Sequence, residues 1–239
     1  MALLLEIKNE IKKAANPEKA KILQRFFKTG KGEYGEGDIF VGITVPESRK
    51  IAIKFKDLSL ENVEFFLQSN IHEERLIALL LLVHNYGLAE KSKDEISKEN
   101  IYNFYLKSLK YINNWDLVDL SADKIMGPYL INKEKYILYK LSNSQNIWER
   151  RIAIIATFYF IKNNEFDDTL KIAEILLSDK HDLIHKAVGW MLREIGKKNE
   201  DILKNFLNEN YEKMPRTMLR YAIERFPEDI RKKYLNGKI

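Results

Sequence analysis

Residues 148–154 read WERRIAI, and segments of the same kind recur along the chain. Each has a charged or aromatic start followed by apolar residues at helical spacing. Their equivalent positions lie 42, 33, 34 and 34 residues apart, at Ala78, Leu120, Ala153, Ala187 and Tyr221. Repeats of this length, built from two amphipathic helices, are typical of HEAT-like solenoids, in which each helix pair buries its apolar face against its neighbours.

The rest of the chain has helical periodicity almost throughout, with helices expected over 115–131 and 146–162 among others. The run DIFVGITV at 38–45 is the one β-prone stretch. We therefore predict an all-α, HEAT-like helical-repeat solenoid forming a single domain over 1–239. The second helix of each pair would line a concave groove, along which the repeat aligns Trp115, Arg150, Arg151, Lys186, Trp190, Arg216 and Arg220.

The composition excludes several classes of protein and site. None of the 239 residues is cysteine, so disulfides, thiolate metal sites and cysteine nucleophiles are ruled out. The N-terminus resembles an amphipathic helix and not a signal peptide. The longest apolar run, at 76–83, is too short to span a bilayer. We expect a cytoplasmic monomer with no membrane association and no cofactor.

The positive charge is concentrated at one end of the chain. The formal net charge is +5, and residues 180–239 alone contain 14 Lys or Arg and 9 Asp or Glu. A basic region of this kind indicates a polyanionic partner such as nucleic acid. The alternative is an ordinary solvated, lysine-rich surface.

Three short motifs give weak signals. GKGEYG at 30–35 has dinucleotide-fingerprint spacing, but a helical segment precedes it, so we interpret it as a flexible loop. HEERL at 72–76 lacks the second histidine of a zinc protease. His181 and His185 are spaced to chelate a metal, but they lack an evident third ligand apart from Asp182, and we expect them to face solvent or DNA. We predict no metal site.

Asp116, Asp119 and Asp123 form the most suggestive acidic group. They could bind a metal for phosphodiester hydrolysis, or they could be solvent-exposed carboxylates near a helix start. Asp116 fits the second interpretation well. Asp119 fits it less well, because it lies four residues after Trp115 and so near the same helix face. A carboxylate beside an indole is a candidate for charge chemistry.

The three tryptophans have different expected roles. For Trp148 we expect packing or helix capping. Trp115 and Trp190 belong to the groove-side helices, each near a charged residue, Asp119 and Arg193 respectively. Aromatic residues interleaved with basic ones are how proteins stack against nucleotides.

The segments NPEKAKILQRFF, NNWDLVDLSA, NIWERRIAI and HKAVGWMLRE together resemble the DNA alkylation repair family, the AlkD-like HEAT-repeat alkylpurine DNA glycosylases. The resemblance covers Asn16 to Phe226. It implies a catalytic cleft made by Trp115, Asp119, Arg151 and Trp190, and a DNA surface that also includes Lys186, Arg193, Arg216 and Arg220. Some members have a tyrosine where this chain has Phe26, and the loop at 29–38 is longer than in some relatives.

The resemblance implies hydrolysis of the N-glycosidic bond of cationic N3- or N7-alkylated purines in duplex DNA, without base flipping. Asp119 would stabilise the oxocarbenium-like transition state or orient water. Trp115 and Trp190 would pack against the cationic nucleotide, and Arg151 would hold a phosphate. Two alternatives remain at this point: a non-catalytic HEAT-like binder of damaged or branched DNA, and a protein-interaction scaffold.

Overall fold

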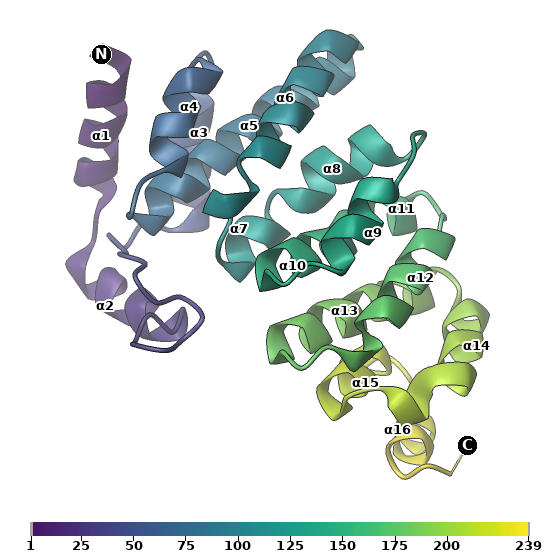
Figure 1. Cartoon of the computed structure of the whole chain (residues 1–239). Helices are drawn as coiled ribbons and strands as arrows, with labels where there is room; N and C mark the ends of the chain where they lie inside the picture. The colour runs from purple at the N-terminus through teal and green to yellow at the C-terminus, as the bar shows by residue number, and fades with distance from the viewer. Residues whose placement is uncertain (1, 239) are drawn as a thin grey trace. The chain divides into compact units, whose positions relative to one another are not determined.

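The computed structural model describes residues 2–238, and these residues are helical without a β-strand (Figure 1). The chain divides into two compact units, Met1–Ile125 and Met126–Ile239, which are described in turn. The prediction of an all-α fold is confirmed. The β-prone run at 38–45 is an extended segment whose Ile39 forms an isolated parallel bridge with Ile71.

The first unit consists of helices joined by short connections, apart from the long segment 27–44 between its second and third helices. Its helices are α1 Ala2–Ala14, α2 Pro17–Phe26, α3 Val45–Lys54, α4 Leu60–Leu67, α5 His72–Ser92, α6 Glu95–Lys107 and α7 Trp115–Asp119, with a 3-10 turn at Leu109–Tyr111. α8, Ala122–Leu130, crosses the boundary between the units.

α5 is the central helix of the first unit. It packs against α3, α4 and α6, and every residue from His72 to Leu82 is buried. The apolar stretch at 76–82 is therefore core, enclosed by the neighbouring helices. Among the helices that the structure describes, none has the length and apolar character needed to cross a membrane.

The second unit continues with shorter helices and one long one. They are α9 Tyr136–Ser142, α10 Ile147–Ala156, α11 Phe158–Lys162, α12 Asp167–Ile175, α13 Asp182–Lys198, α14 Glu200–Asn210, α15 Arg216–Ala222 and α16 Glu228–Leu235, with 3-10 turns at Leu176–Ser178 and Tyr211–Lys213. α13 is central here and packs on α10, α14 and α15.

The repeat prediction is confirmed in the placement of helices. The five aligned segments fall near the starts of α5, α7, α10, α13 and α15. Asparagine side chains accept backbone N–H groups at several helix starts: Asn16 at α2, Asn114 at α7, Asn146 at α10 and Asn199 at α14. A short polar side chain at this position satisfies donors that the helix leaves unpaired.

Gly189 lets α13 approach α15 closely, since a Cβ there would lie 2.5 Å from the Met218 carbonyl oxygen.

Two expected helices are each interrupted once. The segment 115–131 divides into α7 and α8 at Ser121, and 146–162 divides into α10 and α11 at Thr157. In both cases a hydroxyl donates to a carbonyl of the preceding turn, Ser121 to Leu117 at 2.5 Å and Thr157 to Ile154 at 2.7 Å. Such bonds compete with the regular helical pattern and bend it. The sequence reading also missed α16, which is short and mostly polar.

Candidate active site

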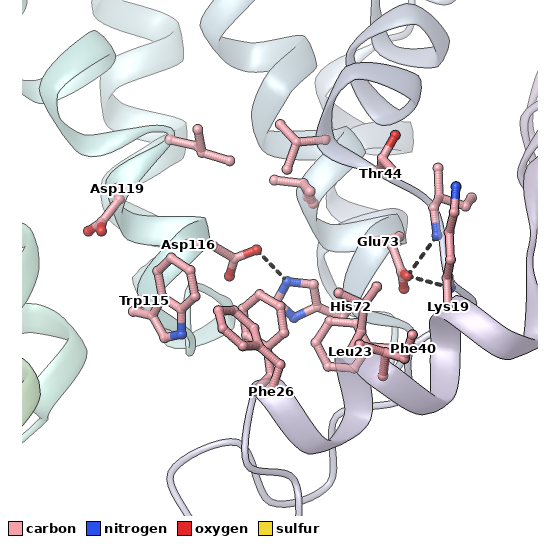
Figure 2. A pocket seen from close by; sticks show the side chains of 17 residues that line it. Lys19, Leu23, Phe26, Phe40, Thr44, His72, Glu73, Trp115, Asp116 and Asp119 are labelled. Atoms are coloured by element: carbon pink, nitrogen blue, oxygen red, sulfur yellow. Dashed lines mark hydrogen bonds and ion pairs between the residues drawn. The ribbon is translucent and has the colours of Figure 1, made fainter.

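A pocket of about 480 Å³ lies in the first unit, between α2, the segment 40–45, the start of α5 and α7 (Figure 2). Its walls are mainly aliphatic and aromatic, and a few charged side chains reach them. The apolar lining includes Ile22, Leu23, Phe26, Phe27, Phe40, Ile43, Val45, Leu76, Trp115 and Leu120. A pocket of this size, mostly apolar with convergent polar groups, is the usual form of a small-molecule or cofactor site.

The aromatic side of the pocket is a stacked column. The Trp115 ring stacks on Phe27, with centroids 5.0 Å apart and planes 11° apart. Phe27 in turn stacks on Phe40 at 4.7 Å, and Phe40 on the His72 imidazole at 4.3 Å. Phe26 meets the Trp115 ring edge-on at 5.9 Å. These contacts fix the plane of the half-buried indole, because offset and edge contacts between rings are directional.

Trp115 and Asp119 line the same pocket, which confirms that they share a face of the chain. They occupy the first and last positions of the five-residue helix α7, one helical turn apart. In Figure 2 both lie on the α7 side of the pocket, across from Lys19 and Glu73. Asp119 as a residue is half-buried, so it is partly shielded from water.

A buried network of charges lies beneath the aromatic column. His72, the first residue of α5, is 1% exposed, with Nδ1 3.0 Å from Asp38 Oδ2 and Nε2 2.8 Å from Asp116 Oδ2. Arg75 donates to the other oxygen of Asp38 at 2.5 Å, and Asn114 donates to Asp38 Oδ2 at 3.0 Å. Two carboxylates and two cations are thus paired out of contact with water.

The carboxylates keep the imidazole charged. Burial, the largest single influence, lowers the pKa of His72, but Asp116 and then Asp38 outweigh it and raise the pKa from 6.5 to about 9. Burial likewise opposes ionisation of Asp38, yet His72, Arg75 and Asn114 hold its pKa below the ordinary value. His72 and Asp38 are therefore both ionised at neutral pH.

The solvent-exposed interpretation of Asp116 and Asp123 is wrong. Asp116 is 6% exposed and bonded to His72, and Asp123 is 2% exposed and paired with Lys124 at 2.6 Å. Asp116 and Asp119 both line the pocket, and of the three aspartates only Asp119 is half-buried. Within residues 2–238 no group of three or more His, Cys, Asp or Glu is placed to hold a metal ion.

Glu73 fixes the wall of the pocket opposite α7. Its buried carboxylate accepts the backbone N–H groups of Val41, Gly42 and Ile43, at 2.8 to 3.2 Å. Gly42 has φ +87°, and a Cβ there would lie 2.0 Å from the Asn16 carbonyl oxygen, so glycine is required. The sequence motif HEER thus organises the pocket. His72 bonds to Asp116, Glu73 to Gly42 and Arg75 to Asp38, and these partners lie 44, 31 and 37 residues away in the sequence.

This role of HEER could not be found from the sequence. Its partners, Asp38 and Asp116, lie 34 and 44 residues from His72. A usable signal was present in the four ionisable residues at 72–75, which directly precede the apolar run at 76–83, since charges at buried positions have to be paired.

The loop at 29–38 consists of hydrogen-bonded turns. Glu33 and Glu36 side chains accept the N–H groups of Gly30 and Gly32, and the Gly35 N–H donates to the Lys28 carbonyl. The loop ends at Asp38, so it connects directly to the buried network. Phe26, just before it, is 61% exposed at the rim of the pocket.

The remaining expected site residues belong to the second unit. Arg151, on α10, is buried and donates from Nη1 to the Leu183 carbonyl at 2.5 Å. Its neighbour Arg150 bonds Asp179 at 2.6 Å. On α13, Trp190 is half-buried against Phe158, with its indole N–H donating to Glu194 at 3.1 Å.

Basic residues accompany Trp190 along α13 and α15. Lys186 and Arg193 lie on the face of α13 that carries Trp190, with Lys186 paired to Asp182 at 2.7 Å and Arg193 bonded to Glu224. Arg216 and Arg220, on α15, are exposed, and Arg216 donates to the Leu235 carbonyl. Trp148 is buried, which confirms its packing role.

His181, the residue before α13, and His185, within α13, both bind backbone groups. His181 Nδ1 accepts the Leu183 N–H at 3.2 Å and so caps the helix, while His185 Nε2 lies 2.5 Å from the Asp179 carbonyl oxygen. Both side chains are half-buried, so they are partly open to solvent, and contact with DNA stays a prediction.

Comparison with known proteins gives a consistent result. The model of the family described as "DNA alkylation repair enzyme" matches residues 7–226. A solved structure titled a predicted DNA alkylation repair enzyme from Enterococcus faecalis has 18% identity and a TM-score of 0.67, covering 90% of this chain and 97% of that one. AlkD2 from Streptococcus mutans has 19% identity and a TM-score of 0.57, covering 87% and 97%.

A third structure, smu.31 from Streptococcus mutans UA159, has 22% identity and a TM-score of 0.55, covering 77% of this chain and 93% of that one. At these identities the structural likeness establishes the helical-repeat fold. Among curated proteins, none matches the sequence.

Proposed function

We propose a DNA glycosylase activity for this chain, which belongs to the DNA alkylation repair enzyme family. The substrate would be duplex DNA containing purines alkylated at N3 or N7. The observation that carries the proposal is the placement of Trp115 and Asp119 on one short helix, both lining the same largely apolar pocket.

The chemistry of the substrate explains the need for these two side chains. An N3- or N7-alkylpurine carries a positive charge, so its departure as a neutral base is already favourable. As the C1′–N9 bond breaks, its electron pair neutralises the base and positive charge develops on the deoxyribose. A partly shielded carboxylate close to that sugar stabilises this charge more than water would. We assign this role to Asp119.

The second substrate is water. Its oxygen forms the new bond to C1′, and one of its protons passes to the Asp119 carboxylate before release to solvent. The Trp115 indole, held in plane by Phe27, would offer its electron-rich face to the cationic nucleotide. No lysine is assigned as a Schiff-base nucleophile, so the product is a free base and an intact abasic strand.

The second unit would supply contacts to the duplex. We assign Arg151 to a backbone phosphate, Trp190 to the nucleotide, and Lys186, Arg193, Arg216 and Arg220 to the basic DNA surface. Several of these cations have carboxylate or carbonyl partners in the protein, which hold the side chains in defined positions. Phosphate contacts position the lesion without reading sequence, and we propose that no base is flipped.

The test compares base release by the wild type and Asp119→Asn, with Asp57→Asn as the matched control, since Asp57 is an exposed carboxylate of the same unit. Asp119→Asn should lower the single-turnover rate about 100-fold or more while leaving DNA affinity unchanged or higher. Equal rates for the two variants would contradict the role of Asp119. Salt-dependent binding without base release by the wild type would identify a non-catalytic binder.

A further inference from the structure

The buried network beneath the pocket has a geometry that requires a charged ring. Both ring nitrogens of His72 face carboxylate oxygens, at 3.0 Å from Asp38 and 2.8 Å from Asp116. An ionised carboxylate only accepts hydrogen bonds, and a neutral imidazole can donate from one nitrogen alone. Both contacts are therefore satisfied when the ring is an imidazolium.

The charges that surround His72 come from each segment packed on it. Asp38 ends the loop at 29–38, Arg75 follows on α5, and Asp116 belongs to α7. Glu73, the next residue on α5, directs its carboxylate to the N–H groups of Val41–Ile43 instead. With His72 and Arg75 protonated and both aspartates ionised, the cluster is electrically neutral. Neutrality is needed because an unpaired charge away from water is very costly.

The cluster binds the chain on both sides of Trp115. Asn114, the residue before it, donates to Asp38 at 3.0 Å, and Asp116, the residue after it, accepts from His72. The Trp115 ring itself rests on Phe27, whose ring lies 5.1 Å from the imidazole. α7 has only five residues, so its own helical hydrogen bonds are few. Its position is set chiefly by these flanking bonds and by buried Leu117 and Val118.

We infer that His72 is a positioning residue, whose imidazolium, clamped between Asp38 and Asp116, holds α7 so that Trp115 and Asp119 face the pocket together. His72 also lines the pocket, but the role inferred for it is exerted through α7 and not through contact with the reacting atoms. The effect of His72 on catalysis rests on the proposed function. The clamp, meaning the contacts of His72 with Asp38 and Asp116, is a property of the folded protein.

The first experiment observes the ring directly. Long-range ¹H–¹⁵N NMR of the wild type follows the four histidine rings through a pH titration, with His72→Gln used for assignment and His84→Gln, on the same helix, as the control. His72 should show the imidazolium pattern at neutral pH. A neutral ring at neutral pH would overturn the inference.

The second experiment measures the position of Trp115. Its indole N–H signal, assigned with Trp115→Phe, should move in folded His72→Gln and stay in place in His84→Gln. An unmoved signal in His72→Gln would overturn the inference.

If His72→Gln does not fold, Asp116→Asn replaces it, because an asparagine amide can donate to a neutral Nε2 and so keeps the bond. In Asp116→Asn the titration midpoint of His72 should fall, and an unchanged midpoint would refute the clamp.

The third experiment separates positioning from general stability. In His72→Gln, the kcat for base release should fall roughly 10- to 100-fold with little change in KM, as expected when reacting groups are displaced by a fraction of an ångström to about 1 Å. In a protein that already contains Asp119→Asn, His72→Gln should lower kcat little further, since His72 acts by positioning α7 and its Asp119. If the two substitutions together lower kcat by the product of their separate effects, the positioning role is contradicted. If the wild type releases no base, the proposed function fails, and the two NMR experiments still decide the clamp.

Discussion

The stability of this protein should depend on pH through one buried histidine. The pKa of His72 is about 9 in the folded protein against an ordinary 6.5. Folding therefore favours the protonated ring, and the stabilisation is fully present below about pH 6.5 and is lost as the pH rises through about 9. A difference of about 2.5 pH units corresponds to about 3 kcal/mol, since each unit is worth about 1.4 kcal/mol.

Urea unfolding of the wild type and His72→Gln, measured from about pH 5.5 to about pH 10, isolates this contribution. The wild type should be more stable than the variant at the acid end, and the difference should shrink by about 3 kcal/mol across the series. Asp38, whose pKa is lowered, contributes stability that is lost only as the pH falls below its ordinary value of 3.8, outside this range.

A difference that stays constant across the series would refute the reasoning, because it would mean that His72 has the same pKa in the folded and unfolded chains. A difference that grows with pH would be equally contrary, since it would require a depressed pKa and a neutral buried ring. His84→Gln, at a half-buried position of the same helix, is the matched control for loss of a histidine side chain.

Three further changes test other contacts. Glu73→Gln should destabilise the protein by about 2–4 kcal/mol in urea unfolding, because one carboxylate oxygen becomes an NH2 donor facing backbone N–H groups and the remaining amide oxygen is a neutral, weaker acceptor. Gly189→Ala should cost about 1–3 kcal/mol by crowding Met218, whereas Gly87→Ala, in open space, should stabilise by up to about 1 kcal/mol in the same assay. Phe26→Tyr should change stability by less than about 0.5 kcal/mol, because the side chain is 61% exposed. The same substitution should tighten duplex binding up to about fivefold, measured by fluorescence anisotropy, because the new hydroxyl adds one hydrogen bond.

Much of the fold follows from local patterns in the sequence. Periodicity located most helices, and the repeat spacing placed the starts of α5, α7, α10, α13 and α15 correctly. The interruptions at Ser121 and Thr157 were missed because a hydroxyl that bonds a nearby carbonyl leaves the apolar period unchanged. α16 was missed because its mostly polar residues give a weak amphipathic signal.

The pocket could be predicted only in part. The i, i+4 spacing of Trp115 and Asp119 was enough to place them on one face, and both line the pocket. The pairing of His72 with Asp38 and Asp116 joins three distant segments, and no periodicity reports such contacts. For the same reason the sequence favours an exposed helix-start role for Asp116, although this acid is buried in an ion cluster.

The most direct test of the proposed function is base release by the wild type. A duplex containing a single N7-methylguanine is incubated with excess protein, and the free base and the DNA strand are quantified together. We expect free 7-methylguanine well above the uncatalysed rate, with a strand that breaks only after alkaline treatment, as a monofunctional glycosylase leaves an intact abasic site. Release no faster than in buffer, despite salt-sensitive binding of the duplex, would contradict the account.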